Sequence, residues 1–89
     1  MPVLVSADIK GQTKEGYEGI LAALKGYIIK APGFVLHTSH ETPDGWRVIE
    51  VWNSKREADE WYSRHVAPNL PPGINPKRSY QELRSFVSP

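Results

Sequence analysis

The sequence predicts an α+β fold in which one antiparallel sheet of four strands packs against two helices on one face. Three observations lead to this prediction. The hydrophobic periodicity changes along the chain in the order β-α-β-β-α-β. Thr42-Pro43-Asp44-Gly45 has the composition of a tight turn between two β-rich runs. Ser54 and Glu57 have the spacing of a capping box at the start of a helix.

The composition limits the classes of function. The 89 residues, 1–89, are enough for one domain and too few for two. Basic and acidic residues are interspersed and leave a net charge of +1, so we expect no nucleic-acid partner. The absence of cysteine excludes disulfides, thiolate catalysis and cysteine-ligated metals. No apolar run approaches the length of a membrane span and no signal-peptide pattern is present, so we expect no membrane association and a cytoplasmic location.

The first third of the chain predicts a strand and then a helix. Val3 to Ile9 alternates, and its apolar face consists of Val3, Val5, Ala7 and Ile9. Thr13 is the expected N-cap of a helix over 14–30. Apolar residues recur there at spacings of three and four, namely Tyr17, Ile20, Leu21, Leu24, Tyr27 and Ile28. Pro32 ends the helix, and Gly33 allows the turn that follows.

A β-hairpin is predicted next, with strands over 34–39 and 46–52. Pro43 presets φ in the turn, and Gly45 is expected to adopt a positive φ. The second strand has two different faces. One face carries Trp46, Val48, Glu50 and Trp52, and the other carries Arg47, Ile49 and Val51.

The last third predicts a helix, a loop and a strand. The helix begins at the Ser54 cap and runs to Val66, with Ala58, Trp61, Tyr62, His65 and Val66 on its apolar face. A loop over 68–77 contains four prolines, and alternation resumes over 79–87. This order is the ferredoxin-like arrangement, which leaves one sheet face without helices. We expect that face to carry Trp46, Glu50, Trp52, Tyr80 and Phe86, and a second copy of the chain to cover it.

Part of the sequence resembles a known family. The helix end Ala31-Pro32-Gly33-Phe34, a strand with His37, and the run from Gly45-Trp46-Arg47 to Glu50-Val51-Trp52-Asn53-Ser54 are similar to the antibiotic biosynthesis monooxygenase (ABM) type of dimeric α+β barrel. The resemblance covers residues 3–70. It implies a homodimer with a small-molecule cavity in each subunit. It also implies oxygenation of aromatic or polyketide-like substrates without a cofactor. Polyketide cyclases, isomerases and haem-degrading enzymes share this superfamily.

Glu50 and His37 are the first candidates for catalysis. Between Trp46 and Trp52, the Glu50 carboxylate is expected to be desolvated and able to act as a general acid or base. The structural alternative is a salt bridge or hydrogen bond that fixes the sheet or the dimer, with Arg84 or Arg47 as candidate partners of Glu50. His37 could transfer a proton from an acidic phenol or β-dicarbonyl carbon, and its alternative is a hydrogen bond within the sheet.

Tyr62 and His65 are three residues apart on the predicted helix and are expected to share a face. The resemblance places them where cyclases of the superfamily use a Tyr and a His on the substrate. The alternative is a core Tyr and a His at a helix C-terminus. Aromatic side chains are expected to shape the pocket or, alternatively, to anchor the core and the interface; these are Trp46, Trp52, Trp61, Tyr62 and Tyr80.

The sequence therefore predicts a homodimeric enzyme that binds a small hydrophobic or aromatic molecule. His37, Glu50 or His65 is the expected base. The expected reaction is cofactor-independent oxygenation, with cyclisation or isomerisation as the second interpretation and non-catalytic ligand binding as the third. We expect no metal site, because His37 and His40 lie on opposite faces of a strand.

Overall fold

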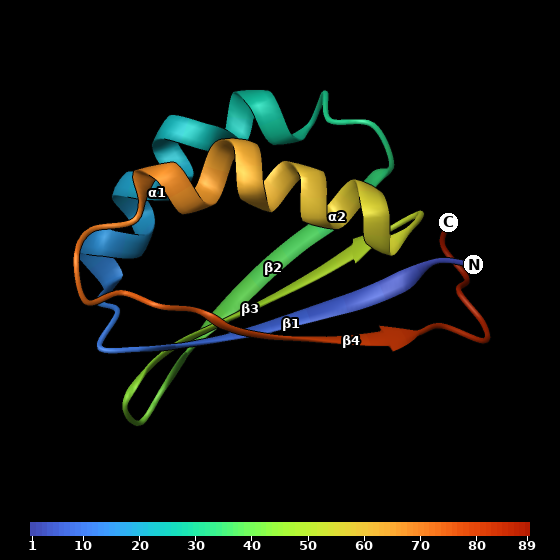
Figure 1. Cartoon of the computed structure of the whole chain (residues 1–89). Helices are drawn as coiled ribbons and strands as arrows, with labels where there is room; N and C mark the ends of the chain where they lie inside the picture. Colours follow the sequence, from blue (N-terminus) through green and yellow to red (C-terminus); the bar gives the residue numbers. More distant parts are fainter.

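The computed structural model describes residues 1–89 and contains one sheet and two α-helices (Figure 1). The elements follow the predicted order: β1 (Val3–Lys10), α1 (Lys14–Ile28), β2 (Phe34–Thr42), β3 (Gly45–Trp52), α2 (Lys55–Trp61) and β4 (Lys77–Glu82). The strands form an antiparallel sheet in the order β2-β3-β1-β4. Both helices cover the same face, side by side, and the opposite face has no helix (Figure 1). The predicted fold class is confirmed.

Both predicted helix caps are present. The Thr13 side chain accepts a hydrogen bond from the backbone N–H of Gly16, and the Ser54 side chain accepts one from that of Glu57. Each bond satisfies one of the backbone donors that a first helical turn leaves free. These local interactions set where α1 and α2 begin.

The end of the second helix and the last strand differ from the prediction. The α-helix ends at Trp61, and the chain continues as a π-helical turn over Tyr62–Val66 and a 3₁₀ turn over Ala67–Asn69. Strand β4 spans Lys77–Glu82 rather than 79–87. It pairs only with β1, which begins at Val3, so the ladder has no partner beyond Glu82.

The two turn glycines act in different ways. Gly33 has φ +82°, as predicted for the turn after α1. Gly45 is not among the residues with positive φ, so that prediction is wrong. Glycine is needed at this position because a Cβ on Gly45 would lie 2.1 Å from the carbonyl oxygen of Ile9.

The prediction that Trp46, Glu50 and Trp52 lie on the uncovered sheet face is wrong. Trp52 pairs with Val3 and Glu50 with Val5, and paired residues of an antiparallel ladder point to the same face. The apolar face of β1 is buried beneath the helices, so these β3 side chains are beneath them too. Tyr80 also pairs with Val5 and faces the helices, whereas Phe86 lies beyond β4. The prediction that the side chains of β3 alternate between two faces was correct. Which of these faces points toward the helices follows only from the register of β3 with β1.

The core lies between the sheet and the helices. Its central cluster is Val3, Val5, Ile28, Trp52, Ala58 and Trp61, and Trp52 is fully buried. By register, the uncovered face carries an aliphatic group of Leu4, Leu36, Ile49 and Val51 beside an Arg47–Asp8 ion pair. None of the helices is long and apolar enough to cross a membrane.

Candidate functional site

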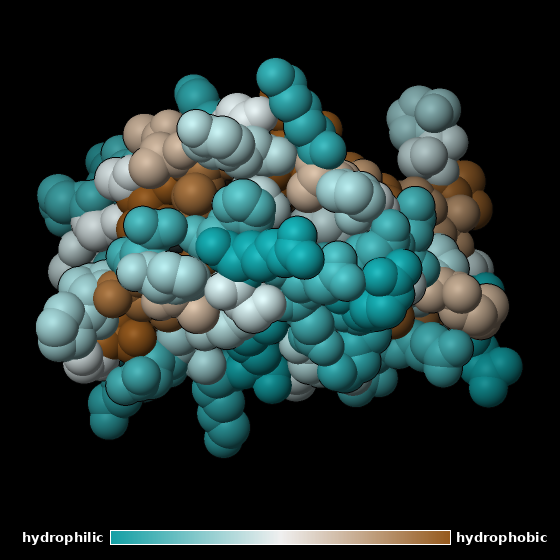
Figure 2. All heavy atoms as spheres, turned by 45° about the horizontal axis from the view of Figure 1, so that its top comes forward, coloured by the Kyte–Doolittle hydropathy of each residue, from teal (hydrophilic) through white to brown (hydrophobic).

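A cavity of about 100 Å³ lies between the helices and the sheet face that they cover. Most of its wall is apolar and comes from β1, α1 and the π-helical turn, including Val5, Ala7, Ile20, Leu24, Ile28 and Val66. The helical side of the molecule is mainly hydrophilic, with apolar atoms grouped toward each end (Figure 2). One of these groups lies where the start of α1 meets the chain leading into β4 (Figures 1 and 2).

A chain of hydrogen bonds connects this cavity to the core. Tyr17 Oη and His37 Nε2 are 2.6 Å apart, and His37 Nδ1 and Glu50 Oε2 are also 2.6 Å apart. The Trp52 indole N–H donates to Glu50 Oε1 at 2.9 Å. Tyr17, His37 and Glu50 all line the cavity. The wall therefore contains a phenol, an imidazole and a carboxylate in direct contact.

The fold brings these groups together from three elements. His37 on β2 and Glu50 on β3 are directly paired in the hairpin, so their side chains lie next to each other on the covered face. Tyr17 lies one helical turn after the Thr13 cap, and its N–H donates to the Thr13 carbonyl at 2.9 Å. Its ring stacks on Trp46, with centroids 5.2 Å apart. The cap and this stacking hold the Tyr17 hydroxyl over the hairpin.

The hydrogen bonds define how His37 can act. When Glu50 is ionised, the adjacent Nδ1 of His37 carries the proton and donates it to Oε2. The Nε2 atom is then an acceptor and receives the Tyr17 O–H. A carboxylate behind one imidazole nitrogen makes the other nitrogen a base, and in His37 that nitrogen is bonded to Tyr17, which also lines the cavity.

Tyr17 remains protonated in this arrangement. Burial raises the pKa of its hydroxyl, a polar contact with Ser39 lowers it, and the nearby charge of Glu50 raises it, with a net upward shift. The neutral phenol is therefore favoured well into the alkaline range. Tyr17 can therefore donate a hydrogen bond or transfer a proton, and it does not act as a permanently ionised phenolate.

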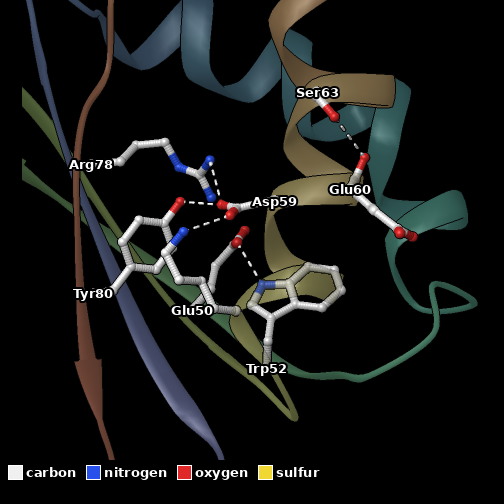
Figure 3. Close-up of polar contacts among 8 residues, drawn as sticks. Glu50, Trp52, Asp59, Glu60, Ser63, Arg78 and Tyr80 are labelled. Atoms are coloured by element: carbon white, nitrogen blue, oxygen red, sulfur yellow. Dashed lines mark hydrogen bonds and ion pairs between the residues drawn. The ribbon is translucent and has the colours of Figure 1, made fainter.

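A second polar cluster lies at the β4 side of the cavity (Figure 3). Arg78 and Tyr80 extend from β4 toward Asp59 on α2. Tyr80 donates to Asp59, and Lys55 Nζ lies 2.8 Å from the same carboxylate. The Cζ atom of Arg78 lies over the Tyr62 ring, 3.9 Å from its centroid. Of this cluster, Arg78 and Tyr62 line the cavity.

The same cluster shifts two pKa values in opposite directions. Burial of Tyr80 and its hydrogen bond to Asp59 raise the pKa of the phenol to about 12. Burial of Asp59 acts to raise its pKa, but hydrogen bonds from Lys55 and Tyr80 and the charges of Lys55 and Arg78 outweigh it. The net result is a lowered pKa for Asp59. Asp59 is thus a fixed anion that organises its neighbours.

The other candidates lie outside the cavity wall. Trp52 is in the core, Trp46 packs on Tyr17 with its indole N–H buried and unpaired, and Tyr80 is bonded to Asp59. His65 stacks between Trp61 and Tyr27, with ring centroids 4.6 and 6.3 Å away.

The structure thus separates some of the predicted site residues from others. Trp61 and Tyr62 reach the cavity together with His37 and Glu50, whereas His65 does not. Tyr62 and His65 do not share a face toward the cavity, because the chain changes from an α-helix to a π-helical turn at Tyr62. The structural alternative for Glu50 is correct in that its carboxylate is hydrogen-bonded within the sheet, but its partners are neither Arg47 nor Arg84. Glu50 bonds to His37 and Trp52, and Arg47 pairs with Asp8 on the other face.

Two side chains of the candidate site, Tyr17 and Arg78, were not predicted from the sequence. Tyr17 was counted among the apolar positions of its helix, where a phenol and a core side chain follow the same periodicity. Arg78 lay just before the predicted start of the last strand. An Arg two residues before Tyr80 in an alternating run was the available signal, since the two must share a face if the strand begins earlier.

Solved structures show the same fold over the full chain. SnoaB, a cofactor-independent oxygenase from Streptomyces nogalater, aligns with a TM-score of 0.64 at 17% identity, over 97% of this chain and 96% of its own. The haem degrader MhuD from Mycobacterium tuberculosis, with two haems bound in its active site, aligns with a TM-score of 0.63 at 17% identity, over 99% and 100%. No family model matches the sequence, and no curated protein does.

The chain has the ABM-type fold. The resemblance noted from the Gly45–Ser54 run is thus confirmed at the level of fold. At this level of identity the alignment carries no information on the reaction, because one fold supports many chemistries. What the ABM-type fold does here has to be argued from Tyr17, His37, Glu50 and the cavity that they line.

Proposed function

We propose that this protein is a small-molecule enzyme in which His37, paired with Glu50, removes a proton from a substrate held in the cavity. The observation that carries the proposal is the Tyr17–His37–Glu50 chain of hydrogen bonds on the wall of an apolar cavity. A carboxylate orients the imidazole, and Nε2 on its other side exchanges a proton with the substrate through the Tyr17 hydroxyl that is bonded to it. His37 is preferred to His65 as the base because His65 is absent from the cavity wall.

The size and lining of the cavity favour one aromatic ring. A volume of about 100 Å³ is below that of pockets that bury drug-sized ligands, which hold roughly 300 Å³ or more. It is comparable with an apolar cavity of about 150 Å³ that binds benzene. We therefore propose a single-ring phenol, hydroquinone or small β-dicarbonyl as substrate. A polycyclic, polyketide-like substrate would need side chains such as Tyr62 and Leu70 to move outward.

The proposed reaction is oxygenation without a cofactor, which is also what SnoaB is described as performing. Removal of the hydroxyl proton of a phenol, or of a CH₂ proton of a β-dicarbonyl, makes an electron pair available at a carbon that still carries one hydrogen. That pair forms a bond to O₂, and protonation gives a hydroperoxide on this carbon. Loss of water from the hydroperoxide leaves a carbonyl group. The substrate gains one oxygen atom, the second leaves as water, and the substrate itself supplies all the electrons.

Tyr17 completes the proton path. Its hydroxyl is positioned to donate to the developing oxyanion or to return a proton from His37 to the hydroperoxide. Because burial raises its pKa, Tyr17 carries that proton at neutral pH. The same three residues could also serve a cyclase or isomerase, which needs the base and the donor but consumes no O₂.

The assembly is also a proposal. The uncovered sheet face carries three half-buried aliphatic side chains, Leu4, Leu36 and Ile49, around Val51, which is already buried in the single chain. We propose that two copies pair through these faces as a homodimer. The cavity lies on the opposite side of the sheet, so each subunit of the dimer would keep its own site.

Oxygen consumption with a panel of single-ring phenols, hydroquinones and β-dicarbonyls tests the proposal. Turnover is expected in the wild type and in His65→Ala, and a loss of about 100-fold or more is expected in His37→Ala and Glu50→Gln. Product formation without O₂ uptake would favour the cyclase or isomerase. Ligand binding that survives all these substitutions, with no turnover of any ligand, would identify a binding module and contradict the proposal.

A further inference from the structure

The β4 end of the cavity carries a positive charge that the protein does not fully neutralise. The Arg78 side chain is 13% exposed and lines the cavity. Its nearest carboxylate is Asp59, with Nη1 and Oδ1 3.7 Å apart, which is an ion pair too long for a hydrogen bond. Asp59 already accepts hydrogen bonds from Lys55 and Tyr80. Two cations therefore share one carboxylate.

The Arg78 guanidinium is also held in place. Its Cζ atom lies over the Tyr62 ring, 3.9 Å from the centroid, and Tyr62 lines the same cavity. A cation–π contact of this kind uses none of the N–H donors of the guanidinium. Its planar fork of donors matches the two oxygens of a carboxylate. Arg78 thus has the charge, the geometry and the unused donors for an anion.

The rest of the cavity offers no competing anion for this cation. Glu50 is the one acidic residue in the wall, and its two oxygens are taken by His37 and Trp52. A second cation, Lys25 of α1, also lines the cavity. The net charge around the bound molecule is therefore positive on the side away from Glu50.

We propose that the natural ligand is a single-ring aromatic carboxylate whose carboxylate binds Arg78. This inference rests on the proposed function and narrows its substrate class. The ring would lie in the apolar middle of the cavity, and its opposite end would meet Tyr17 and His37. Arg78 is the specificity-determining residue in this account, and His37 is the base.

The sheet register supports a ligand of this length. Arg78 on β4 pairs with Ala7 of β1, and His37 on β2 pairs with Glu50 of β3, so β1 and β3 lie between the two polar ends. Three strand spacings separate β4 from β2, or about 14 Å. The Arg78 side chain and the His37 ring take up part of this span, and a benzene ring with a carboxylate at one end and a hydroxyl at the other fits the remainder.

A matched pair of probes tests the inference. The ligands 4-hydroxybenzoate and 4-hydroxybenzamide share a ring and a hydroxyl and differ in charge. Calorimetric titration of the full-length wild type is expected to show about 10- to 100-fold tighter binding of the carboxylate, as a charge-assisted bidentate contact provides. In Arg78→Gln the ratio of the two affinities, carboxylate over amide, is expected to fall to about one. Arg47→Gln is the control, because Arg47 is on the other sheet face and pairs with Asp8.

Some outcomes would overturn the inference. Equal binding of both probes by the wild type would do so, as would saturable binding of neither probe up to about 10 mM. A preference that survives in Arg78→Gln would also do so. The wild-type comparison needs no variant to fold. Arg78→Lys, which keeps the charge without the planar fork, is expected to retain only part of the preference.

The carboxylate preference and the turnover are measured separately, so the anion site and the proposed base can fail independently. His37→Ala is expected to keep the carboxylate preference while losing turnover. A preference for the carboxylate together with no turnover of any ligand would support the anion site and contradict the proposed base. Turnover of neutral phenols with no preference for the carboxylate would support the base and overturn the anion site.

Discussion

Glu50 links the hydrophobic core to the cavity because its two oxygens have different partners. One accepts the indole N–H of the fully buried Trp52, and the other meets His37. A buried polar group that loses its partner costs about 1–3 kcal/mol, so Glu50 contributes to stability whether or not it takes part in chemistry. The same two hydrogen bonds of Glu50 therefore serve both its structural role and its proposed role in catalysis.

The substitution Glu50→Gln is expected to lower the free energy of unfolding by about 1–3 kcal/mol. The amide oxygen can still accept from Trp52, but the amide N–H₂ then opposes the His37 N–H. Urea unfolding at pH 7 measures the change. Glu60→Gln is the control, because Glu60 makes only an exposed pair with Arg56, and a change within about 0.5 kcal/mol is expected there. Equal losses in the two variants would contradict this account of Glu50.

Tyr80 is expected to make the free energy of unfolding fall as the pH becomes strongly alkaline. The pKa of its phenol is raised to about 12, above an unfolded value of about 10. A raised pKa means that the hydrogen bond to Asp59 stabilises the fold fully below about pH 10 and is lost as the pH rises toward 12. The stability difference between the wild type and Tyr80→Phe is therefore expected to be constant at pH 7–9 and to shrink above about pH 10. A difference that stays constant up to pH 12 in urea unfolding would refute it.

The β2–β3 hairpin depends on close contact between backbones. A Cβ at Gly45 would lie 2.1 Å from the carbonyl oxygen of Ile9, a backbone atom that cannot move without disturbing β1. The exposed glycines of α1 are different, since a Cβ at Gly19 meets no atom within 4 Å. Substitution by alanine is therefore expected to destabilise the protein at Gly45 and to stabilise it at Gly19.

Gly45→Ala is expected to destabilise the protein by about 2 kcal/mol or more, because the strand pairing must shift. Gly19→Ala is expected to stabilise it by about 0.5–1 kcal/mol, because alanine favours the helix. Thermal or urea unfolding of the two variants beside the wild type measures both values. A change of the same sign in both would show that close packing is not what requires Gly45.

The sequence was informative wherever structure is set by neighbouring residues. The caps at Thr13 and Ser54 and the order of the elements were predicted because each depends on side chains within a few positions. The end of α2 was not, since no local signal marks the π-helical turn that begins at Tyr62. The direction of the faces of β3 was not predicted either, because both carry large apolar side chains.

The candidate site was predicted in part for the same reason. His37 and Glu50 come from one hairpin, and alternation along its two strands makes their meeting foreseeable. Tyr17 and Arg78 join them from α1 and β4, which are distant in sequence. Whether Tyr17 and Arg78 reach the cavity depends on helix packing and on the β1–β4 register, and no local sequence pattern predicts either of these.

At the scale of the whole molecule, the two faces of the sheet have different roles. One face holds the core and the cavity beneath the helices (Figure 1). The other has no helix over it and carries the half-buried Leu4, Leu36 and Ile49 around the buried Val51. For a chain of 89 residues, pairing with a second copy is an effective way to bury more apolar surface.

Ile49→Asp is therefore expected to convert a dimer into a monomer, because an ionised carboxylate would be buried at the centre of the interface. Sedimentation equilibrium gives the mass of each species. Lys14→Asp, on the exposed start of α1, is the control and should remain dimeric. A wild type that is monomeric at high micromolar concentration would rule out pairing through this face.

The central claim is that His37, held by Glu50, acts as a base on a molecule in the cavity. Deuterium exchange at the CH₂ carbon of each bound β-dicarbonyl, followed by NMR in D₂O without oxygen, tests it directly, because it detects proton removal before any later step. The account predicts that the wild type accelerates exchange about 100-fold or more over buffer, and that His37→Ala abolishes the acceleration while His65→Ala retains it. Exchange at the same rate in the wild type and His37→Ala, for every ligand that binds, would contradict the claim.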